Sequence, residues 1–188
     1  RPLFEGEARM NDSILAQLQE WKPRAILIIM RTDHLTKRLE EDPVMLRRWS
    51  ETVAGVAATS ESVYFVVQTP KSVEYELKGD SEMLLYRLIS VLLDEGSGSL
   101  PELVREPLNS RQSRRWIREW AGNLGIANLK LLDPGEQLLK GAKVSVSNEG
   151  RLLFVDDDHL SNFGAEKVAP LFERVFSSGL SLNQVPSK

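Results

Sequence analysis

The sequence predicts an α/β fold, a three-layer sandwich in which a parallel sheet lies between layers of helices. Short apolar segments rich in Val, Ile and Leu alternate with amphipathic segments, as in parallel sheets that helices cover on both faces. The composition, 41% hydrophobic and 27% charged, is that of a soluble globular protein. A chain of 188 residues has the length of one domain. We therefore expect a single domain over residues 1–188, with its core at about 13–177.

The first half of the chain is expected to form two helices and two buried strands. Residues 12–21 predict an amphipathic helix that Asp12-Ser13 would cap. An uninterrupted apolar run at 25–30 predicts a strand covered on both faces. Asp and Pro at the start of 42–56 predict the N-terminus of the next helix. Residues 63–67 predict a second buried strand.

The second half is expected to continue this alternation. Strands are expected at 129–133, 144–146 and 152–155, and helices at 84–92, 116–124 and 168–176. The stretch 94–101 is rich in Gly and Ser and resembles a linker. We interpret it as a surface loop, because neither half alone would hold enough strands for a domain.

The composition also excludes several classes of protein. A net charge of -3 is too small to indicate a nucleic-acid partner. Cysteine is absent, which excludes disulfides and thiolate metal sites. No apolar run approaches the roughly 18–20 residues that a membrane-spanning helix needs.

Three predicted strands are followed by residues that can carry chemistry. In open parallel sheets, reactive groups collect just beyond the carboxyl ends of the strands. The three segments are Arg-Thr-Asp-His at 31–34, Gln-Thr-Pro at 68–70 and Asp-Asp-Asp-His at 156–159. His34 could approach such a site, or it could be a surface histidine in a charged loop.

The Asp-x-x-His spacing at 156–159 is the most informative of these patterns. In a tight turn, Asp156 can accept a hydrogen bond from Nδ1–H of His159, which leaves Nε2 able to take a proton from a hydroxyl. The neighbouring carboxylates should raise the basicity of the ring. Two other interpretations stay open: a solvated acidic loop with a surface histidine, and a metal site. Adjacent carboxylates that are not spaced to converge disfavour the metal site, and no metal is expected.

Residues 154–165, Phe-Val-Asp-Asp-Asp-His-Leu-Ser-Asn-Phe-Gly-Ala, resemble the last conserved block of SGNH hydrolases. They are most similar to the C-terminal SGNH domain of the acyltransferase-3 membrane family. Trp-Lys-Pro at 21–23 with the strand that ends in Arg31, the strand and Pro-containing turn at 63–70, and Leu-Leu-Asp-Pro at 131–134 resemble further segments of that family in the same order.

The resemblance implies an SGNH or flavodoxin-like fold and a Ser-His-Asp mechanism. Asp156 would orient the ring and His159 would be the general base. Arg31 would lie near the oxyanion site, or it would be a structural arginine that pairs with Asp33 or with the acidic cluster. Gln68 would line the pocket. The resemblance further implies a small acyl group such as acetyl, a carbohydrate acceptor, no cofactor, and an N-terminal membrane acyltransferase domain. The SGNH domain would then lie outside the cytoplasm, in the periplasm or an equivalent space.

The nucleophile of this family lies in a Gly-Asp-Ser block after its first strand. Gly-Asp-Ser occurs here at 79–81, but it follows a charged, alternating segment and comes after two core strands. Ser81 therefore reads as a helix cap, with the nucleophile as the alternative. We expect the domain to be N-terminally incomplete, without its first strand, and to have little activity alone. The alternative function is a non-catalytic SGNH-like module that positions a substrate or partner.

A basic cluster surrounds Trp116. Its members are Arg111, Arg114, Arg115 and Arg118. We interpret it as a solvated helix face, with a contact to membrane phosphates or a partner domain as the alternative.

Overall fold

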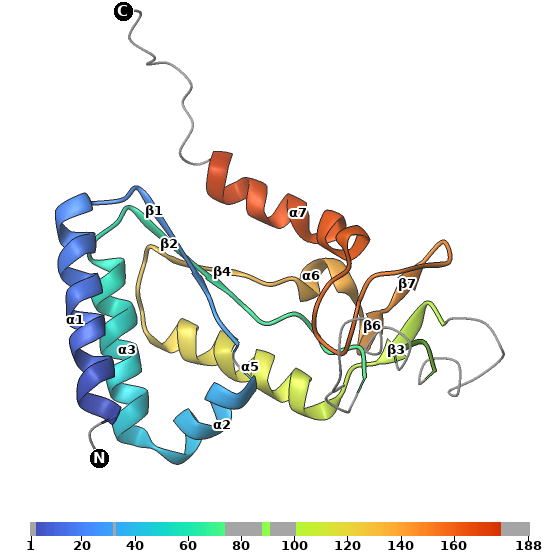
Figure 1. Cartoon of the computed structure of the whole chain (residues 1–188), viewed down its shortest axis with the longest axis horizontal. Helices are drawn as coiled ribbons and strands as arrows, with labels where there is room; N and C mark the ends of the chain where they lie inside the picture. Colours follow the sequence, from blue (N-terminus) through green and yellow to red (C-terminus); the bar gives the residue numbers. More distant parts are fainter. Residues whose placement is uncertain (1–2, 32, 74–87, 91–100, 178–188) are drawn as a thin grey trace, which may run out of the picture.

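The computed structural model describes residues 3–31, 33–73, 88–90 and 101–177, and has the mixed α/β architecture that the sequence predicts (Figure 1). The helices are α1 (Leu3–Trp21), α2 (Asp33–Glu41), α3 (Pro43–Ala57), α5 (Leu108–Asn123), α6 (Gly135–Leu138) and α7 (Asn162–Ser177). The strands are β1 (Ala25–Ile29), β2 (Ser62–Val66), β3 (Leu103–Arg105), β4 (Leu129–Leu132), β5 (Leu139–Lys140), β6 (Lys143–Ser145), β7 (Ser147–Asn148) and β8 (Arg151–Leu152).

The central sheet has three parallel strands in the order β1-β2-β4. Phe65 of β2 is opposite Ile28 of β1 and Leu131 of β4. Because side chains alternate along a strand, Phe65 and Tyr64 point to opposite faces of the sheet. β2 therefore lies at the centre, and its side chains form part of the core on both faces.

Helices cover the two faces of this sheet. On one face, Phe65 packs with Trp49 of α3 and with Ile117 and Trp120 of α5. On the other face, Tyr64 and the neighbouring apolar side chains pack against the C-terminal half of α7. Figure 1 shows α7 on the opposite side of the sheet from α5. This arrangement confirms a parallel sheet flanked by helices.

The described chain also contains two small antiparallel sheets outside the central sheet. β3, β6 and β5 form a small antiparallel sheet, and β7 and β8 form a hairpin. The expected parallel strand at 152–155 is therefore wrong, since Leu152 pairs antiparallel in the β7–β8 hairpin and Phe154 forms a single antiparallel bridge with Leu160. Leu153 and Phe154 are apolar because they are fully buried in the core beneath α7, not because they extend the central sheet.

Local signals predicted some helix ends and not others. Asp42 caps α3 as expected, since its Oδ1 accepts hydrogen bonds from the amides of Val44 and Met45 at 3.0 Å. Ser161 caps α7 by accepting from the amide of Gly164 at 3.0 Å. Ser13, in contrast, lies inside α1 and is not its cap.

Two segments are more helical than expected. α1 begins at Leu3 because residues 3–10 are mostly good helix formers, and one Asp-Ser pair costs too little to end a helix. The charged segment after Arg31 is α2 and not a loop. Residues 88–90 are helical, whereas the rest of the expected helix at 84–92 and nearly all of the linker-like stretch lie outside the described residues. No helix in the described segments is both long and apolar enough to span a bilayer.

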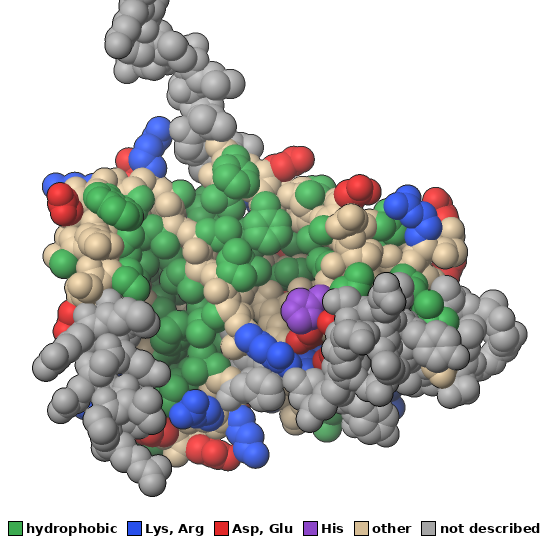
Figure 2. Space-filling view, in the orientation of Figure 1, with side chains coloured by type: hydrophobic (Ala, Val, Ile, Leu, Met, Phe, Trp, Pro, Cys, Tyr) green, Lys and Arg blue, Asp and Glu red, His purple; other side chains and the backbone are tan. Residues whose placement is uncertain are grey.

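One face of β1 is uncovered, although its sequence predicts cover on both faces. Leu27 is 37% exposed and Ile29 is 67% exposed. Both lie on the α7 side of the sheet, opposite Tyr64 and Val66 in the register. Figure 2 shows a broad hydrophobic area on this face of the molecule. β1 is an edge strand whose outer side pairs with none of the described residues.

Candidate functional site

The loop 156–159, between β8 and α7, lies against the segment that follows β2 (Figure 1). The amide of Ser72 donates to the carbonyl of Asp157 at 2.8 Å, and its hydroxyl donates to the carbonyl of Asp156 at 3.0 Å. A backbone bridge between Phe154 and Leu160 closes the base of the loop. The loop thus reaches the carboxyl edge of the central sheet without being the end of a parallel strand.

Asp156 holds the ring of His159 as the spacing predicts. Its Oδ2 lies 2.8 Å from Nδ1 of the ring. Its Oδ1 accepts hydrogen bonds from the backbone amides of Asp158 at 3.0 Å and His159 at 2.7 Å. Both oxygens of this carboxylate are therefore fixed, and the ring is oriented through Nδ1. The His159 side chain is 71% exposed, so its other edge faces outward.

The environment shifts the pKa of both groups. Burial raises the pKa of Asp156, but the hydrogen bonds from the amides of His159 and Asp158 and from the ring outweigh it, and the net shift is downward. The hydrogen bond to Asp156 raises the pKa of His159, with the charges of Asp156, Asp158 and Asp157 acting in the same direction and burial opposing them. The pair thus favours a carboxylate beside a basic imidazole.

Asp158 contacts the other two expected site residues, Arg31 and Gln68. Its Oδ1 lies 3.1 Å from Nδ1 of His159. Its Oδ2 lies 3.5 Å from Nη2 of Arg31, after β1, and 3.5 Å from Nε2 of Gln68, after β2. Burial and the neighbouring charge of Asp157 raise the pKa of Asp158, against the charges of Arg31, His159 and Lys71.

The structure therefore brings Arg31, Gln68, Asp156 and His159 together. Figure 2 shows histidine, acidic and basic side chains gathered beside the hydrophobic area. The contact of Arg31 with the acidic cluster is the structural role that the sequence left open beside an oxyanion role. Ser81 lies outside the described residues.

Asp157 has a partner that the sequence analysis missed. Its Oδ2 lies 3.2 Å from Nζ of Lys71, and the two side chains are 5% and 7% exposed. The amide of Lys71 donates to Oγ of Ser110 in α5 at 3.1 Å. No local sequence pattern predicts a pair of residues 86 positions apart. Lys71 does, however, directly follow Gln-Thr-Pro at 68–70, one of the segments that the sequence analysis selected.

The basic cluster around Trp116 is not simply a solvated face. Arg114 is 3% exposed and donates to Glu106 at 2.9 Å and to Asp133 at 2.9 and 3.0 Å. Arg118 also contacts Asp133. The solvated interpretation is wrong for Arg114, because Asp133 at the end of β4 and Glu106 after β3 supply buried carboxylates. The signal that was missed is Asp133 itself, a carboxylate between a buried strand and a proline.

Three of the site residues could hold a cation. The ligand atoms of Asp156, Asp158 and His159 lie within 4.8 Å of one another. The expectation that neighbouring carboxylates would not converge is therefore wrong, because residues two apart in this tight loop turn to the same ring. Nδ1 of His159 already lies 2.8 and 3.1 Å from the two carboxylates, so a cation would have to displace the ring.

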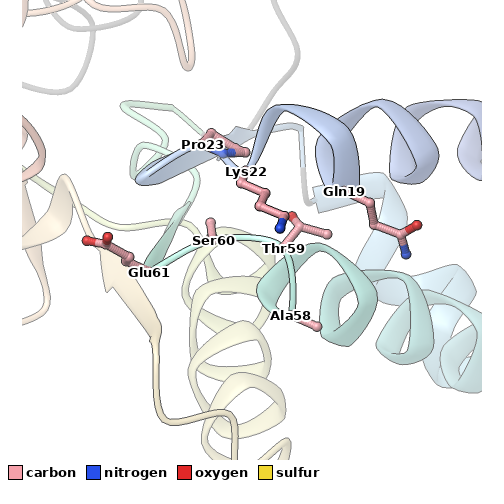
Figure 3. Close-up of a pocket in the computed structure, with 7 residues that line it drawn as sticks. All are labelled: Gln19, Lys22, Pro23, Ala58, Thr59, Ser60 and Glu61. Carbon is pink, nitrogen blue, oxygen red and sulfur yellow. The ribbon is translucent and has the colours of Figure 1, made fainter.

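Two open hollows of the described surface lie outside the cluster around His159. One, of about 490 Å³, lies at the amino ends of β1 and β2, opposite the acidic loop. Figure 3 shows its lining residues, Gln19, Lys22, Pro23, Ala58, Thr59, Ser60 and Glu61. Another, of about 510 Å³, is lined by Ser72 and residues 104–108 among others, and adjoins the segment that holds the loop.

Comparison with known proteins supports this description of the fold. A family model described as the SGNH domain fused to AT3 domains matches residues 4–174. Among solved structures, the periplasmic domain of a lipopolysaccharide acetyltransferase from Salmonella ser. Paratyphi A is similar, with a TM-score of 0.59 and 14% identity. The match covers 90% of this chain and 62% of that one, so this chain corresponds to less than two thirds of its neighbour. A search of curated protein sequences found no significant match.

Proposed function

Because the chain belongs to the family of SGNH domains fused to AT3 domains, we propose that it takes part in acyl transfer or ester hydrolysis, with Asp156 and His159 as two members of a Ser-His-Asp triad. The observation that carries this proposal is the 2.8 Å contact of Nδ1 with Asp156 on a ring whose other edge is exposed. Such a ring can accept a proton at Nε2 while the carboxylate stabilises the imidazolium.

In the proposed reaction, Oγ of a serine attacks the carbonyl carbon of an acyl donor while its proton passes to Nε2 of His159. The carbonyl oxygen takes the negative charge. Collapse of this intermediate expels the leaving alkoxide, which takes the proton back from Nε2. The acyl group then passes by the same steps to an acceptor hydroxyl, or to water in hydrolysis.

Arg31 and Gln68 are proposed to contact the substrate. Both come from the ends of adjacent parallel strands and lie at the same carboxylate as the catalytic ring. The guanidinium side chain is 42% exposed, so an approaching group can reach it. A cation there would stabilise negative charge that develops on the carbonyl oxygen.

The nucleophile is proposed to come from a segment that precedes the present chain. A strand added to the bare edge of β1 would pair in parallel with Ala25–Ile29 and would end beside Arg31. Its elbow would then present a serine at the edge where His159 lies. The exposed Leu27 and Ile29 supply the apolar surface that a following helix would cover. Ser81 is the alternative nucleophile.

The substrates and location are proposals of the same kind. By analogy with the acetyltransferase neighbour, the acyl group would be acetyl or similarly small, and the acceptor a carbohydrate. Fusion to AT3 domains in the family supports a membrane acyltransferase domain as the covalent partner. The periplasmic neighbour supports a place on the extracytoplasmic side of the membrane.

Hydrolysis of a nitrophenyl acetate ester tests the source of the nucleophile. The 188-residue chain should give little turnover above buffer, whereas a protein extended upstream through a Gly-Asp-Ser strand should turn over the ester and lose that activity on replacement of its serine. Turnover by the 188-residue chain that Ser81→Ala abolishes would reject the upstream nucleophile and assign it to Ser81.

A non-catalytic module is the second candidate function. Among the described residues, no serine hydroxyl is hydrogen-bonded to the ring of His159, whose contacts are the carboxylates of Asp156 and Asp158. The exposed apolar face of β1 would suit a domain that positions a partner. An upstream region without a serine elbow would favour this candidate.

A further inference from the structure

Among the described residues, the Asp158 side chain contacts three other side chains of the site. It lies 3.1 Å from the ring of His159, 3.5 Å from Arg31 after β1 and 3.5 Å from Gln68 after β2. Its side chain is only 8% exposed, so these contacts are shielded from solvent on the carboxylate side. The neighbouring Asp157 points elsewhere, to the buried Lys71.

The charges around the ring show why this carboxylate matters. When His159 accepts a proton, an imidazolium and the guanidinium of Arg31 lie at the two oxygens of one carboxylate, and two cations so placed repel each other. Asp158 lies between them, with one oxygen near each cation. Asp156 and Asp157 also act on the charge of the ring, and Asp157 is itself paired with the buried Lys71.

We propose that Asp158 is a positioning residue that holds Arg31 near His159 and allows both side chains to be positively charged at the same time. This inference rests on the proposed function. Asp156 orients the ring and Asp157 anchors the loop, so the three consecutive aspartates have three different tasks. Without the Asp158 carboxylate, Arg31 loses its 3.5 Å contact with the group that also lies 3.1 Å from the ring. Its charge would then no longer act on His159.

This inference is tested by a double-mutant cycle on the pKa of His159, read by NMR titration of the ring in the 188-residue chain. Arg31→Gln should raise the pKa, because it removes a nearby cation. Asp158→Asn should lower it, because it removes a nearby carboxylate. In the Asp158→Asn background, Arg31→Gln should produce a much smaller shift than in the parent chain.

Asp157→Asn is the matched control. It removes the same charge from the adjacent position of the same loop, but the Asp157 side chain contacts the buried Lys71, whereas that of Asp158 contacts Arg31 and the ring. Arg31→Gln should therefore keep its full effect in this background. If Asp158→Asn does not fold, Asp158→Ser removes the carboxylate with a smaller side chain and serves the same comparison.

An Arg31→Gln shift of equal size with and without the Asp158 carboxylate would overturn the inference. Since the measurement needs no catalysis, this result would leave the proposed function standing. Conversely, loss of the proposed function would appear as an acyltransferase that does not depend on His159, whatever the cycle shows.

Discussion

At the scale of single residues, the sequence predicted the contact that is local, gave one distant contact as an alternative and missed another. Asp156 and His159 are three residues apart, so a tight turn is enough to bring them together. Lys71 and Asp157 pair across 86 residues, which the sequence analysis missed. Arg31 meets Asp158 because the loop 156–159 reaches the edge of the sheet at which β1 ends. Such pairs depend on the tertiary fold, and a single sequence contains no local sign of them.

The first prediction concerns the orienting carboxylate. Asp156→Asn should lower the pKa of His159, because the hydrogen bond to Asp156 is the largest cause of its upward shift. The asparagine oxygen can still accept from the two backbone amides, so the loop should stay folded. Titration of the ring by NMR measures the shift. Asp42→Ala, at the distant cap of α3, should leave the ring unchanged and cost about 1 kcal/mol of stability.

The pKa direction also fixes the pH dependence of catalysis. A general base works in its neutral form, so activity should rise with pH through the pKa of His159 and then level off. Because that pKa is raised, the rise should come at higher pH than for an ordinary histidine. Asp156→Asn should move the midpoint to lower pH while reducing the plateau. A midpoint that does not move would show that another group limits the rate.

At the scale of elements, capping signals and apolar runs predicted the central sheet and its helices. The prediction of a parallel strand at 152–155 was wrong because a buried loop and a buried strand can have the same apolar sequence. The solvated interpretation failed for Arg114 because its carboxylate partners, Glu106 and Asp133, lie outside α5 and are themselves buried. The periodicity of apolar residues predicts a helix or strand, but it does not predict which segments pack against that helix or strand.

The junction between the reactive loop and α7 gives a packing prediction. A Cβ at Gly164 would overlap the carbonyl oxygen of Leu153, so Gly164→Ala should destabilise the domain by about 1–3 kcal/mol and disturb the loop. Gly122 in α5 has nothing within 4 Å of such a Cβ, and Gly122→Ala should be neutral or stabilising by up to about 1 kcal/mol. Urea unfolding of the two variants compares them, and equal effects would contradict the close approach.

The buried charges of α5 give a second prediction at this scale. Arg114→Ala leaves Glu106 and Asp133 buried without their main partner and should cost roughly 3–5 kcal/mol. Arg115 pairs with Glu119 on the same helix, but those side chains are 74% and 63% exposed. Arg115→Ala should therefore change the free energy of unfolding by less than about 0.5 kcal/mol. Thermal unfolding of both variants measures the difference.

At the scale of the whole molecule, the central sheet has an open side. The sequence of β1 is apolar throughout, yet Leu27 and Ile29 are exposed on the face beside α7. The sequence predicted a strand with both faces covered, and the described residues cover one. This mismatch is what the proposed upstream strand and helix would remove.

The open face gives the prediction that belongs to this scale. Ile29→Lys should change the stability of the 188-residue chain by less than about 0.5 kcal/mol, because the side chain is 67% exposed. Ile28→Lys, on the packed face of the same strand, should cost roughly 2 kcal/mol or more. In a protein extended upstream, Ile29→Lys should become destabilising. If it stays neutral there, nothing upstream covers this face.

The central claim is that His159 is the base of an acyl-transfer site. The most direct test is the acyl-transfer rate of a protein extended to include the proposed AT3 domain, compared between the parent and His159→Gln. The account predicts a fall of about 10²–10⁴-fold in kcat, with the domain still folded. A His159→Gln variant that retains the parent rate within a few-fold would contradict the account and leave Asp156 and His159 as parts of a binding module.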